Sequence, residues 1–497
     1  MNISRTTIPR RAFVKGGLAG ALAFPYLATA KNALGRTTLA LIGAGKQGRH
    51  LLHQFLGQDV VVTAVCDCDR ARREDRTRVV NEYYEKNPQL GVPKDVCRAV
   101  ADFHAVLADP AIDMVCIATP DHWHAYLAVE AMKAGKDVYC EKPLTHTVNE
   151  AKVIMAVSAK TGRILQTGAM QRSGLEFRTA CEIVRNGGIG RITAVDTLFG
   201  GPSRPPADFE DPSRAAEEGA PNPDVDFDLW CGPAPRVPYS DKLSPRGVHD
   251  YFPGFWRNHD YFGLGGVGDW GAHQLDIAQW GLGMDESGPV KIVKSTEAPS
   301  RDPKCGGRRQ KGVSFVYANG TVVRHADGKT KWRVVFYGTE GIVCVNRGQF
   351  AVWRGKGRGP DRDQLPGLDA GVGGEGLTRT AFWLTDASDP SANDKSLLDA
   401  VNKATKAFGL KKAKVKLYKS LNHPADFVQC CASRQQPISR AEVGARTSIL
   451  CNLANLSYVH DTGFDWDPVK NVFANGTGHA AWLDGFYAAR GNLSVKE

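Results

Sequence analysis

The sequence lacks the features that mark several common protein classes. Beyond residue 30, no apolar run is long enough to span a bilayer as a helix, so we expect no membrane attachment of that part. The 12 cysteines neither cluster nor form paired CxxC motifs, which argues against a disulfide scaffold and a structural zinc site. Lys and Arg outnumber Asp and Glu by 63 to 53, but they are dispersed along the chain. Nucleic acid is therefore not an expected partner.

The first 30 residues have the pattern of an export signal. Arg10 and Arg11 precede an uncharged run over residues 16–27, which is too short to cross a bilayer, and small residues follow it. The order Arg-Arg-Ala-Phe-Val-Lys is similar to a twin-arginine signal, although proline precedes the pair where Ser or Thr is usual. An ordinary secretory signal is the alternative. We predict that residues 1–30 are removed, that the twin-arginine export machinery is a partner, and that the protein is periplasmic or otherwise exported.

Short apolar runs alternate with helical patterns between residues 36 and 165. TTLALIGAG, DVVVTAVCD, DMVCIATP and DVYCEKPL have the composition of buried strands, and amphipathic stretches follow them. Strands that alternate with helices form parallel sheets. We therefore predict an α/β protein whose N-terminal domain, residues 36–165, is a Rossmann domain with a doubly wound parallel sheet.

The pattern changes after residue 165. Segments such as RITAVDTLFGG, GVSFVYANGTVVRHA and WRVVFYGTEGIVCVN show the alternation and turn signals of antiparallel strands. Residues 166–497 are predicted to form an α+β domain for substrate binding and oligomerisation, with a largely antiparallel open sheet. Stretches near 202–253, rich in proline, and near 355–419, rich in glycine and lysine, are interpreted as insertions or long loops.

A dinucleotide-binding motif lies at the start of the first domain. Gly43, Gly45 and Gly48 form GxGxxG directly after a strand and before a helix, so a helix N-terminus can face a pyrophosphate. Asp67 ends the next strand, 19 positions after Gly48, where an acid binds the adenosine ribose. This acid favours NAD. NADP remains possible, because one of the nearby residues Arg70, Arg72 and Arg73 could bind a 2′-phosphate. A second match, GLGGVG at residues 263–268, follows no strand and is interpreted as a flexible approach to a helix.

Two later motifs place polar residues near the same crevice. Thr119 and Pro120 follow one predicted strand and Glu141-Lys142-Pro143 another, and ligands of such sheets bind at the carboxyl ends of the strands. In the second domain, Asp269 and His273 lie four residues apart. Taken alone, such a pair is commonly a surface feature, and a lysine at a strand end is commonly solvated.

These motifs, in this order, resemble the Gfo/Idh/MocA oxidoreductases, and the resemblance covers nearly the whole chain after the signal. It implies a sugar, polyol or glycoside substrate, a nicotinamide cofactor and self-association into a homo-oligomer through the sheet of the second domain. It implies that the catalytic residues are Lys142, Asp269 and His273. It implies that the cofactor-binding residues are Gly43, Gly45, Lys46, Gln47, Gly48, Asp67, Thr119, Pro120, His124, Glu141, Lys142, Gln171, Trp256 and Arg257.

The chemistry of alcohol oxidation fits these residue types. A hydride can leave a hydroxyl-bearing carbon only if the hydroxyl proton also leaves, and His273 can act as the base. Asp269, one helical turn before it, would hold the imidazole or stabilise its cation. Lys142 would donate to the substrate oxygen and stabilise the charge that develops there.

Other residues are open to more than one interpretation. His122 and His124 form an HxH motif, but no further ligands have recognisable spacing, so cofactor contact or helix capping is favoured over a metal. Four aromatic residues could stack on sugar rings or simply pack. They are Trp230, Tyr239, Trp256 and Tyr261.

Three functions are therefore considered. The favoured one is an exported oxidoreductase that holds its nicotinamide cofactor tightly and regenerates it in place, because a folded-protein export route can carry a bound cofactor out of the cytoplasm. The second is a glycoside-cleaving enzyme that oxidises the sugar transiently. The third is a noncatalytic dinucleotide-binding protein. Retention of Lys142, Asp269 and His273 together favours the first function.

Overall fold

The computed structural model describes most of the chain. The described residues are 35–205, 221–294, 312–326, 333–354 and 390–485, without the side chains of 353–354 and 390–396. The predicted signal at residues 1–30 lies outside the described residues, as do parts of both predicted insertions.

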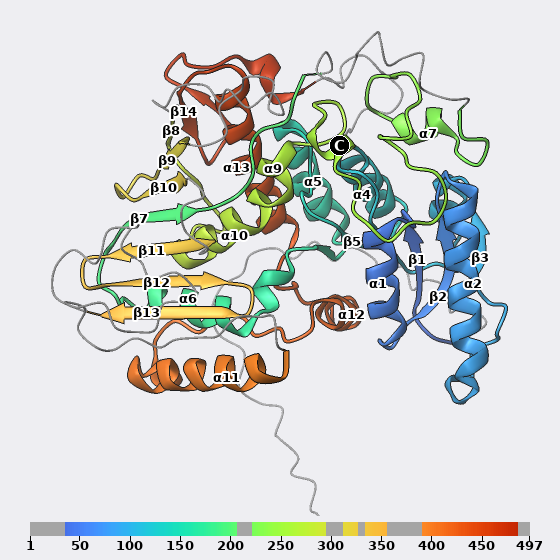
Figure 1. Ribbon diagram of the computed structural model, residues 1–497, viewed down its shortest axis with the longest axis horizontal. Coiled ribbons are helices and arrows are strands. Elements are labelled where there is room, and N and C mark those ends of the chain that lie inside the picture. The colour runs from blue at the N-terminus through green and yellow to red at the C-terminus, as the bar shows by residue number, and fades with distance from the viewer. Residues whose placement is uncertain (1–34, 206–220, 295–311, 327–332, 355–389, 486–497) are drawn as a thin grey trace, which may run out of the picture.

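The first domain is built on a parallel sheet (Figure 1). In the described residues this sheet has six strands in the order β3-β2-β1-β4-β5-β6, and every neighbouring pair is parallel. The strands are β1 (Thr38–Ile42), β2 (Val61–Cys66), β3 (Arg98–Val100), β4 (Met114–Ile117), β5 (Asp137–Cys140) and β6 (Leu165–Thr167). This is the order of a Rossmann sheet, which confirms the predicted fold class, and the sheet ends two residues beyond the predicted boundary at residue 165.

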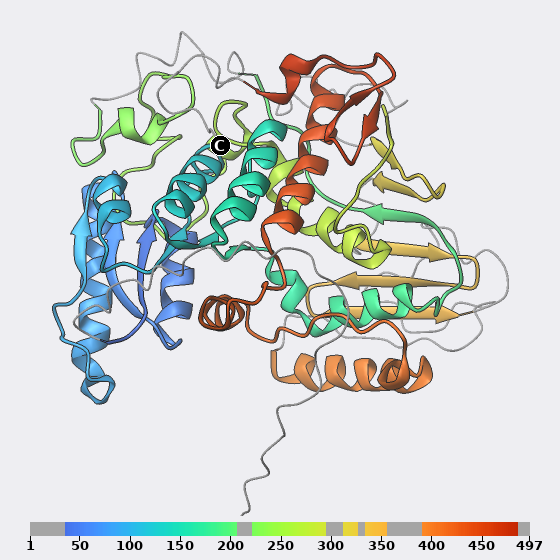
Figure 2. The same cartoon turned by 180° about the vertical axis from the view of Figure 1, so that it is seen from behind.

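Helices cover both faces of this sheet, as the two opposite views in Figures 1 and 2 show. Alternate residues of β1 enter different cores, because Leu39 packs with α1 and α2 while Ala40 packs with α4 and α5. Burial on both faces is why these strands are continuous apolar runs in the sequence. The helices are α1 (Lys46–Leu56), α2 (Arg70–Lys86), α3 (Phe103–Ala108), α4 (His124–Lys133) and α5 (Val148–Thr161).

The second domain contains a larger, mostly antiparallel sheet, as predicted. Its described strands have the order β13-β12-β11-β7-β10-β9-β8-β14-β15, and β7 and β10 form a parallel pair. Helices α6 (Leu175–Arg185) and α10 (Gly271–Leu282) pack against it. The strands are β7 (Ile192–Thr197), β8 (Lys291–Val293), β9 (Ser314–Val316), β10 (Val322–His325), β11 (Val334–Gly338), β12 (Gly341–Asn346), β13 (Gln349–Arg354), β14 (Phe464–Asp467) and β15 (Val472–Ala474).

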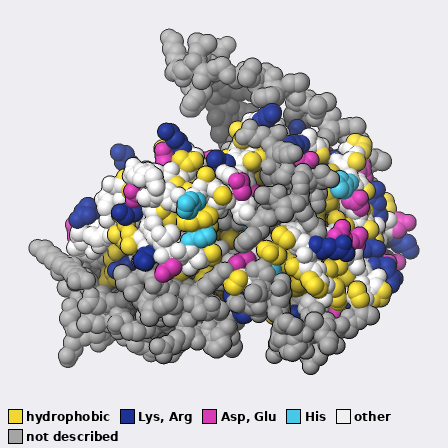
Figure 3. All heavy atoms as spheres, turned by 90° about the horizontal axis from the view of Figure 1, so that it is seen from above, with side chains coloured by type: hydrophobic (Ala, Val, Ile, Leu, Met, Phe, Trp, Pro, Cys, Tyr) yellow, Lys and Arg dark blue, Asp and Glu magenta, His cyan; other side chains and the backbone are white. Residues whose placement is uncertain are grey.

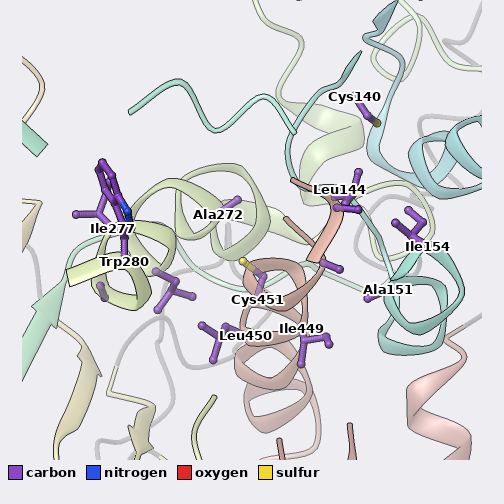
Figure 4. Close-up of a cluster of buried hydrophobic side chains, with 14 of the residues drawn as sticks. Cys140, Leu144, Ala151, Ile154, Ala272, Ile277, Trp280, Ile449, Leu450 and Cys451 are labelled. Atoms are coloured by element: carbon purple, nitrogen blue, oxygen red, sulfur yellow. The ribbon is translucent and has the colours of Figure 1, made fainter. Parts of the chain in front are cut away.

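Helix α13 (Ala441–Val459) joins the two domains through a shared apolar core (Figure 4). Ile449, Leu450 and Cys451 on α13 lie between side chains of α5 and α10. Gly444 allows the helix to approach β6 closely, because a Cβ at this position would lie 1.9 Å from Oγ1 of Thr167. The same core therefore fixes the second domain against the carboxyl end of the Rossmann sheet.

Helix α12 (His423–Ser433) comes from the C-terminal part of the chain but packs on the first domain. The ring of Phe427 lies edge-on to those of Phe55 on α1, with centroids 6.2 Å apart, and Tyr139 on β5, 5.8 Å apart. The Rossmann core thus includes residues from well outside the predicted range of 36–165.

Two stretches for which the sequence predicted no helix contain one. The predicted insertion near 355–419 contains helix α11 (Pro390–Ala407), which packs against α6 and β13 through buried residues that include Ala400 and Ala404. The second glycine motif, read as a flexible approach, includes a short helix, α9 (Gly265–Asp269). A Cβ at Gly266 would lie 2.3 Å from the Cα of Gly200, so the glycines allow two backbone segments to pack closely.

The surface carries charges of both signs. On the face in Figure 3, Lys and Arg side chains are interspersed with acidic ones. No helix in the described part of the chain has the length and apolar character needed to cross a membrane.

Candidate active site

A cavity of about 950 Å³ lies at the carboxyl ends of the Rossmann strands. Residues that follow β1, β2, β4 and β5 line one side, and residues of the second domain line the other. This is the position at which ligands bind doubly wound sheets. The predicted site residues that line it are Gly43, Gly45, Lys46, Gln47, Asp67, Thr119, Pro120, His124, Glu141, Lys142, Trp256, Arg257, Asp269 and His273.

The three glycines of the first motif have three different structural roles. Gly43 has a φ of +95°, and its Cβ would lie 2.6 Å from the backbone of Ala118. A Cβ on Gly48 would lie 1.9 Å from the carbonyl oxygen of Gly43, so this glycine sets the distance between helix and strand. A Cβ on Gly45 would meet nothing within 4 Å, because this residue borders the cavity. Helix α1 begins directly after it, and the open space at its N-terminus fits a pyrophosphate.

Asp67 connects the glycine loop to the end of β2. Its carboxylate accepts from the backbone N–H groups of Ala44, at 2.6 Å, and Asp69, at 2.8 Å. A carboxylate has about four acceptor positions, so two remain for the hydroxyls of a ribose.

The three arginines after Asp67 already have protein partners. Arg70 pairs with Asp224 at 2.5 Å, and Arg73 donates to the Asp67 carbonyl at 3.3 Å. Arg72 donates to the carbonyl oxygens of Gly247, at 3.3 Å, and Pro245. This arrangement offers little free guanidinium to a 2′-phosphate.

Residues 221–254, here called the covering segment, lie across the nucleotide side of the cavity. The segment includes the short helix α7 (Phe227–Cys231). Its backbone joins the end of β2, because the N–H of Asp226 donates to the carbonyl of Cys68 at 3.1 Å. Farther along, Asp250 pairs with Arg49 of α1 at 3.0 Å, and its carbonyl accepts from Lys46. The covering segment therefore encloses the cavity from the side of α1 and α2.

His124 holds two loops together and does not present a free nitrogen to the cavity. Its Nδ1 lies 2.7 Å from the carbonyl of Pro143 and its Nε2 lies 2.9 Å from that of Thr119. Burial lowers its pKa to about 4, so the ring is neutral at pH 7 and donates to one carbonyl at a time. His124 thus has a positioning role, and its contact with the cofactor stays a prediction, since the residue also lines the cavity. Oγ1 of Thr119, in contrast, is buried without a partner in the described residues.

Glu141 is a buried acid at the end of β5. It is 5% exposed, and its Oε1 accepts from Nε2 of Gln47 at 2.8 Å. Burial raises its pKa, against the opposing effect of Lys142. Gly168 makes room for this carboxylate, since a Cβ there would lie 2.8 Å from Oε1.

Lys142 and Asp269 form an ion pair across the two domains. The Nζ of Lys142 lies 2.6 Å from Oδ1 of Asp269 and 2.9 Å from its carbonyl oxygen. Burial alone would raise the pKa of Asp269, but Lys142 and Arg257 beside it hold that pKa below its usual value. The lysine ammonium is thus fixed at the cavity wall.

His273 does not pair with Asp269, contrary to the sequence prediction. Asp269 ends α9 and His273 lies in α10, so the two residues are not on one continuous helix. The Nδ1 of His273 is buried without a partner in the described residues, and burial lowers the pKa of the ring well below its usual value. The imidazole is therefore neutral at pH 7 and able to accept a proton.

Two models of one family match successive parts of this chain. The model described as "Oxidoreductase family, NAD-binding Rossmann fold" matches residues 37–169, and that described as "Oxidoreductase family, C-terminal alpha/beta domain" matches residues 213–347. The chain belongs to the Gfo/Idh/MocA oxidoreductase family.

Two named dehydrogenases are similar to parts of the chain. A myo-inositol 2-dehydrogenase of Thermotoga maritima is 31% identical over 172 residues, which are 34% of this chain and 47% of that protein. A levoglucosan dehydrogenase of Pseudarthrobacter phenanthrenivorans is 26% identical over 295 residues, which are 53% of this chain and 63% of that protein. The matched regions thus span less than two thirds of these relatives.

A solved structure of a levoglucosan dehydrogenase, in complex with NADH and L-sorbose, has the same fold. The TM-score is 0.51 at 18% identity, and the superposition covers 87% of this chain and 100% of that one. Beyond the family motifs, the site of this Gfo/Idh/MocA protein includes residues that the sequence analysis did not single out.

One of these residues is Asp121, which is 7% exposed and lines the cavity. Burial raises its pKa to about 7, although Lys142 and Arg257 oppose this shift. Its place two residues after Thr119, at a strand end, was a signal in the sequence. Trp270 and Arg347 also line the cavity. Arg347 lies in a turn between strands and had no recognisable signal.

The predicted aromatic contacts fall into two groups. Trp230 and Trp256 line the cavity but are only 5% and 8% exposed, because they also pack with Phe262 in a small core. Tyr239 and Tyr261 do not line the cavity. Gln171, a predicted cofactor contact, does not line the cavity either. When its amide is oriented to satisfy both neighbours, its nitrogen donates to the carbonyl oxygen of His273 at 3.1 Å and its oxygen accepts from Nε of Arg347 at 3.3 Å. We assign Gln171 a positioning role.

Proposed function

We propose that this protein oxidises a hydroxyl-bearing carbon of a sugar or polyol with a tightly bound NAD. The observation that carries the proposal is the fixed Lys142–Asp269 pair beside a neutral His273, all at the cavity wall that the glycine loop also borders. The two dehydrogenases named above support a substrate of this class.

The nucleotide side of the cavity fits NAD. The open space at Gly45 and the N-terminus of α1 would receive the pyrophosphate, and Asp67 would accept from the ribose hydroxyls. The partners of Arg70 and Arg72 favour NAD over NADP. The chemistry that NAD supplies when bound is acceptance of a hydride.

The chain's own residues manage the proton and the developing charge. His273, being neutral, accepts the hydroxyl proton as the carbonyl forms. The ammonium of Lys142 donates to the same oxygen and stabilises its negative charge in the transition state. Asp269 fixes the position of that ammonium through its carboxylate and its carbonyl oxygen.

We further propose that the protein is exported in folded form by the twin-arginine route with its cofactor bound. The basic pair Arg10 and Arg11 supports this route. The covering segment supports tight retention, because it encloses the nucleotide side of the cavity through contacts with α1 and α2. Regeneration would then need a second substrate that takes the hydride back. Association into a homo-oligomer through the second-domain sheet is part of the same proposal.

The proposal is tested on purified protein. The nucleotide released by denaturation should be NAD, and absorbance at 340 nm should report reduction of the bound cofactor when sugars and polyols are added. Lys142→Met and His273→Ala should each lower turnover by roughly 10²- to 10⁴-fold with NAD still bound. The matched controls are Lys133→Met and His104→Ala, which change a lysine and a histidine that do not line the cavity.

Three results would contradict the proposal. Release of NADP would overturn the choice of cofactor. Hydrolysis of a glycoside without net reduction of the cofactor would identify the glycoside-cleaving alternative. Full activity of His273→Ala would refute its role as the base.

A further inference from the structure

Arg347 lies at the substrate end of the cavity, in the turn that joins β12 to β13. The turn is fixed by its backbone: the N–H of Gly348 donates to Oε1 of Glu176 at 3.1 Å, and the N–H of Arg347 donates to Oδ1 of Asn346 at 2.9 Å. The larger sheet therefore holds this side chain at the cavity wall that also includes His273.

The guanidinium of Arg347 forms no ion pair with an acid of the described residues, although Glu141, Asp269 and Glu176 act on its charge from farther away. Among the described residues, no carboxylate oxygen lies within 4.0 Å of its nitrogens. Gln171 accepts from its Nε at 3.3 Å, and the described residues provide no hydrogen-bond partner for its two terminal nitrogens. A guanidinium that keeps its terminal nitrogens available presents the planar fork that binds a carboxylate through two parallel hydrogen bonds.

Trp270 supplies an apolar face next to this charge. It lines the cavity and is 37% exposed, whereas Trp230 and Trp256, which also line the cavity, are buried. The Arg347 guanidinium lies 5.1 Å from its ring centroid, and the ring centroid of His273 lies 5.9 Å away. An aromatic ring of this kind can pack against the C–H groups of a sugar while its edge remains in water.

Lys142 and Arg257 are paired with an acid at this end of the cavity, whereas Arg347 is not. Lys142 and Arg257 share the carboxylate of Asp269, at 2.6 and 3.8 Å. Among the described residues, Glu141, Asp269 and Glu176 act on the charge of Arg347 only from beyond ion-pair distance. The carboxylate of an acidic sugar can pair with Arg347 directly, which a neutral sugar cannot do.

We propose that Arg347 binds a carboxylate of the substrate, and that the substrates are acidic sugars, namely uronic or aldonic acids, packed on Trp270 with the reacting hydroxyl at Lys142 and His273. This inference rests on the proposed function and specifies its substrate class. The planar fork of a single arginine matches the two oxygens of a carboxylate.

Binding can be measured without turnover. The NAD-loaded protein would be titrated calorimetrically with glucuronate, galacturonate and gluconate, and with glucose, galactose and glucitol as neutral counterparts. At least one acid should bind about tenfold or more tightly than its neutral counterpart. Arg347→Met should remove this preference, a loss of roughly 10- to 100-fold in affinity for the acid, with little change for the neutral sugar. Arg347→Lys should retain part of it.

The matched control is Arg333→Met. Arg333 also lies over the Trp270 ring, at 5.4 Å, but it does not line the cavity, so its removal should leave the preference for the acid largely intact. Equal affinity for acids and neutral sugars, or an Arg347→Met variant that keeps the preference, would overturn the inference. Tighter binding of glucose 6-phosphate than of the acids would also overturn it. If neutral sugars reduce the bound NAD and the sugar acids do not, this inference is refuted and the proposed function remains in place.

Discussion

Gly45 and Gly48 lie in one motif, yet the structure predicts opposite consequences for adding a side chain to each. Gly45 has a φ of −67°, which any residue can adopt, and a Cβ there would meet nothing within 4 Å. Gly45→Val should therefore fold without steric strain. Glycine is preferred to valine at a helix N-cap, so only the loss of that preference, about 1 kcal/mol, is expected.

The cost of Gly45→Val falls on the ligand. The new side chain would occupy the space at the N-terminus of α1 that fits the pyrophosphate. Overpacking by a few methyl groups costs about 1–3 kcal/mol, which corresponds to a loss of roughly 5- to 150-fold in NAD affinity. The protein should be purified largely without nucleotide.

Gly48→Ala should behave in the reverse way. Its Cβ would lie 1.9 Å from the carbonyl oxygen of Gly43, so either α1 or the end of β1 must shift by about an ångström. Alanine gains about 1 kcal/mol in helix propensity, which offsets only part of a strain of about 1–3 kcal/mol or more. We expect a net loss of about 1–2 kcal/mol in the free energy of unfolding.

The assay combines two measurements on each variant. Urea unfolding of nucleotide-free protein reports the stability of the fold, and the nucleotide released on denaturation, per mole of protein, reports retention of the cofactor. The nucleotide-free state is needed because bound NAD itself stabilises the folded protein. The reasoning would be refuted if Gly45→Val retained a full equivalent of NAD, or if Gly48→Ala unfolded at the same urea concentration as the wild type.

Two further predictions concern the covering segment and pH. Arg72→Met removes the donors to two carbonyl oxygens of the covering segment and should speed the release of bound NAD about tenfold. The rate is measured by trapping the released NAD with a dehydrogenase. Arg78→Met, on the exposed side of the same helix, should leave the rate unchanged. The free energy of unfolding should rise as pH increases from about 4 to 6.5. Burial lowers the pKa of His122 to about 3 and that of His423 to about 4. The unfolded chain therefore binds more protons than the folded protein in this range, and raising the pH favours the folded state. Asp121 and Glu150, whose pKa values burial raises to about 7 and about 8, act in the opposite direction. A urea midpoint that stays flat or falls over this range would show that the histidines do not dominate.

The first domain could be predicted because its signals are local. Its strands are buried on both faces and therefore consist of continuous apolar runs, and the glycine motif, the following helix and Asp67 lie within 25 residues of one another. Helix α11 was missed although its buried positions, including Ala400 and Ala404, have helical spacing, because the surrounding stretch is rich in glycine and lysine.

The arrangement of the site depended on contacts between residues far apart in the chain. Lys142 and Asp269 are 127 positions apart, and their pairing requires α13 to hold the two domains together. The helical spacing of Asp269 and His273 indicated a pair that the break between α9 and α10 prevents.

The sequence by itself determined the residue types, the Rossmann strand pattern and the dinucleotide motif, since each depends on neighbours along the chain. Only the tertiary structure decided which groups share the cavity. Arg347 reaches it through the register of β12 and β13, and the covering segment reaches it through backbone bonds to the end of β2. No local pattern encodes such contacts, because they depend on how separately formed elements pack against one another.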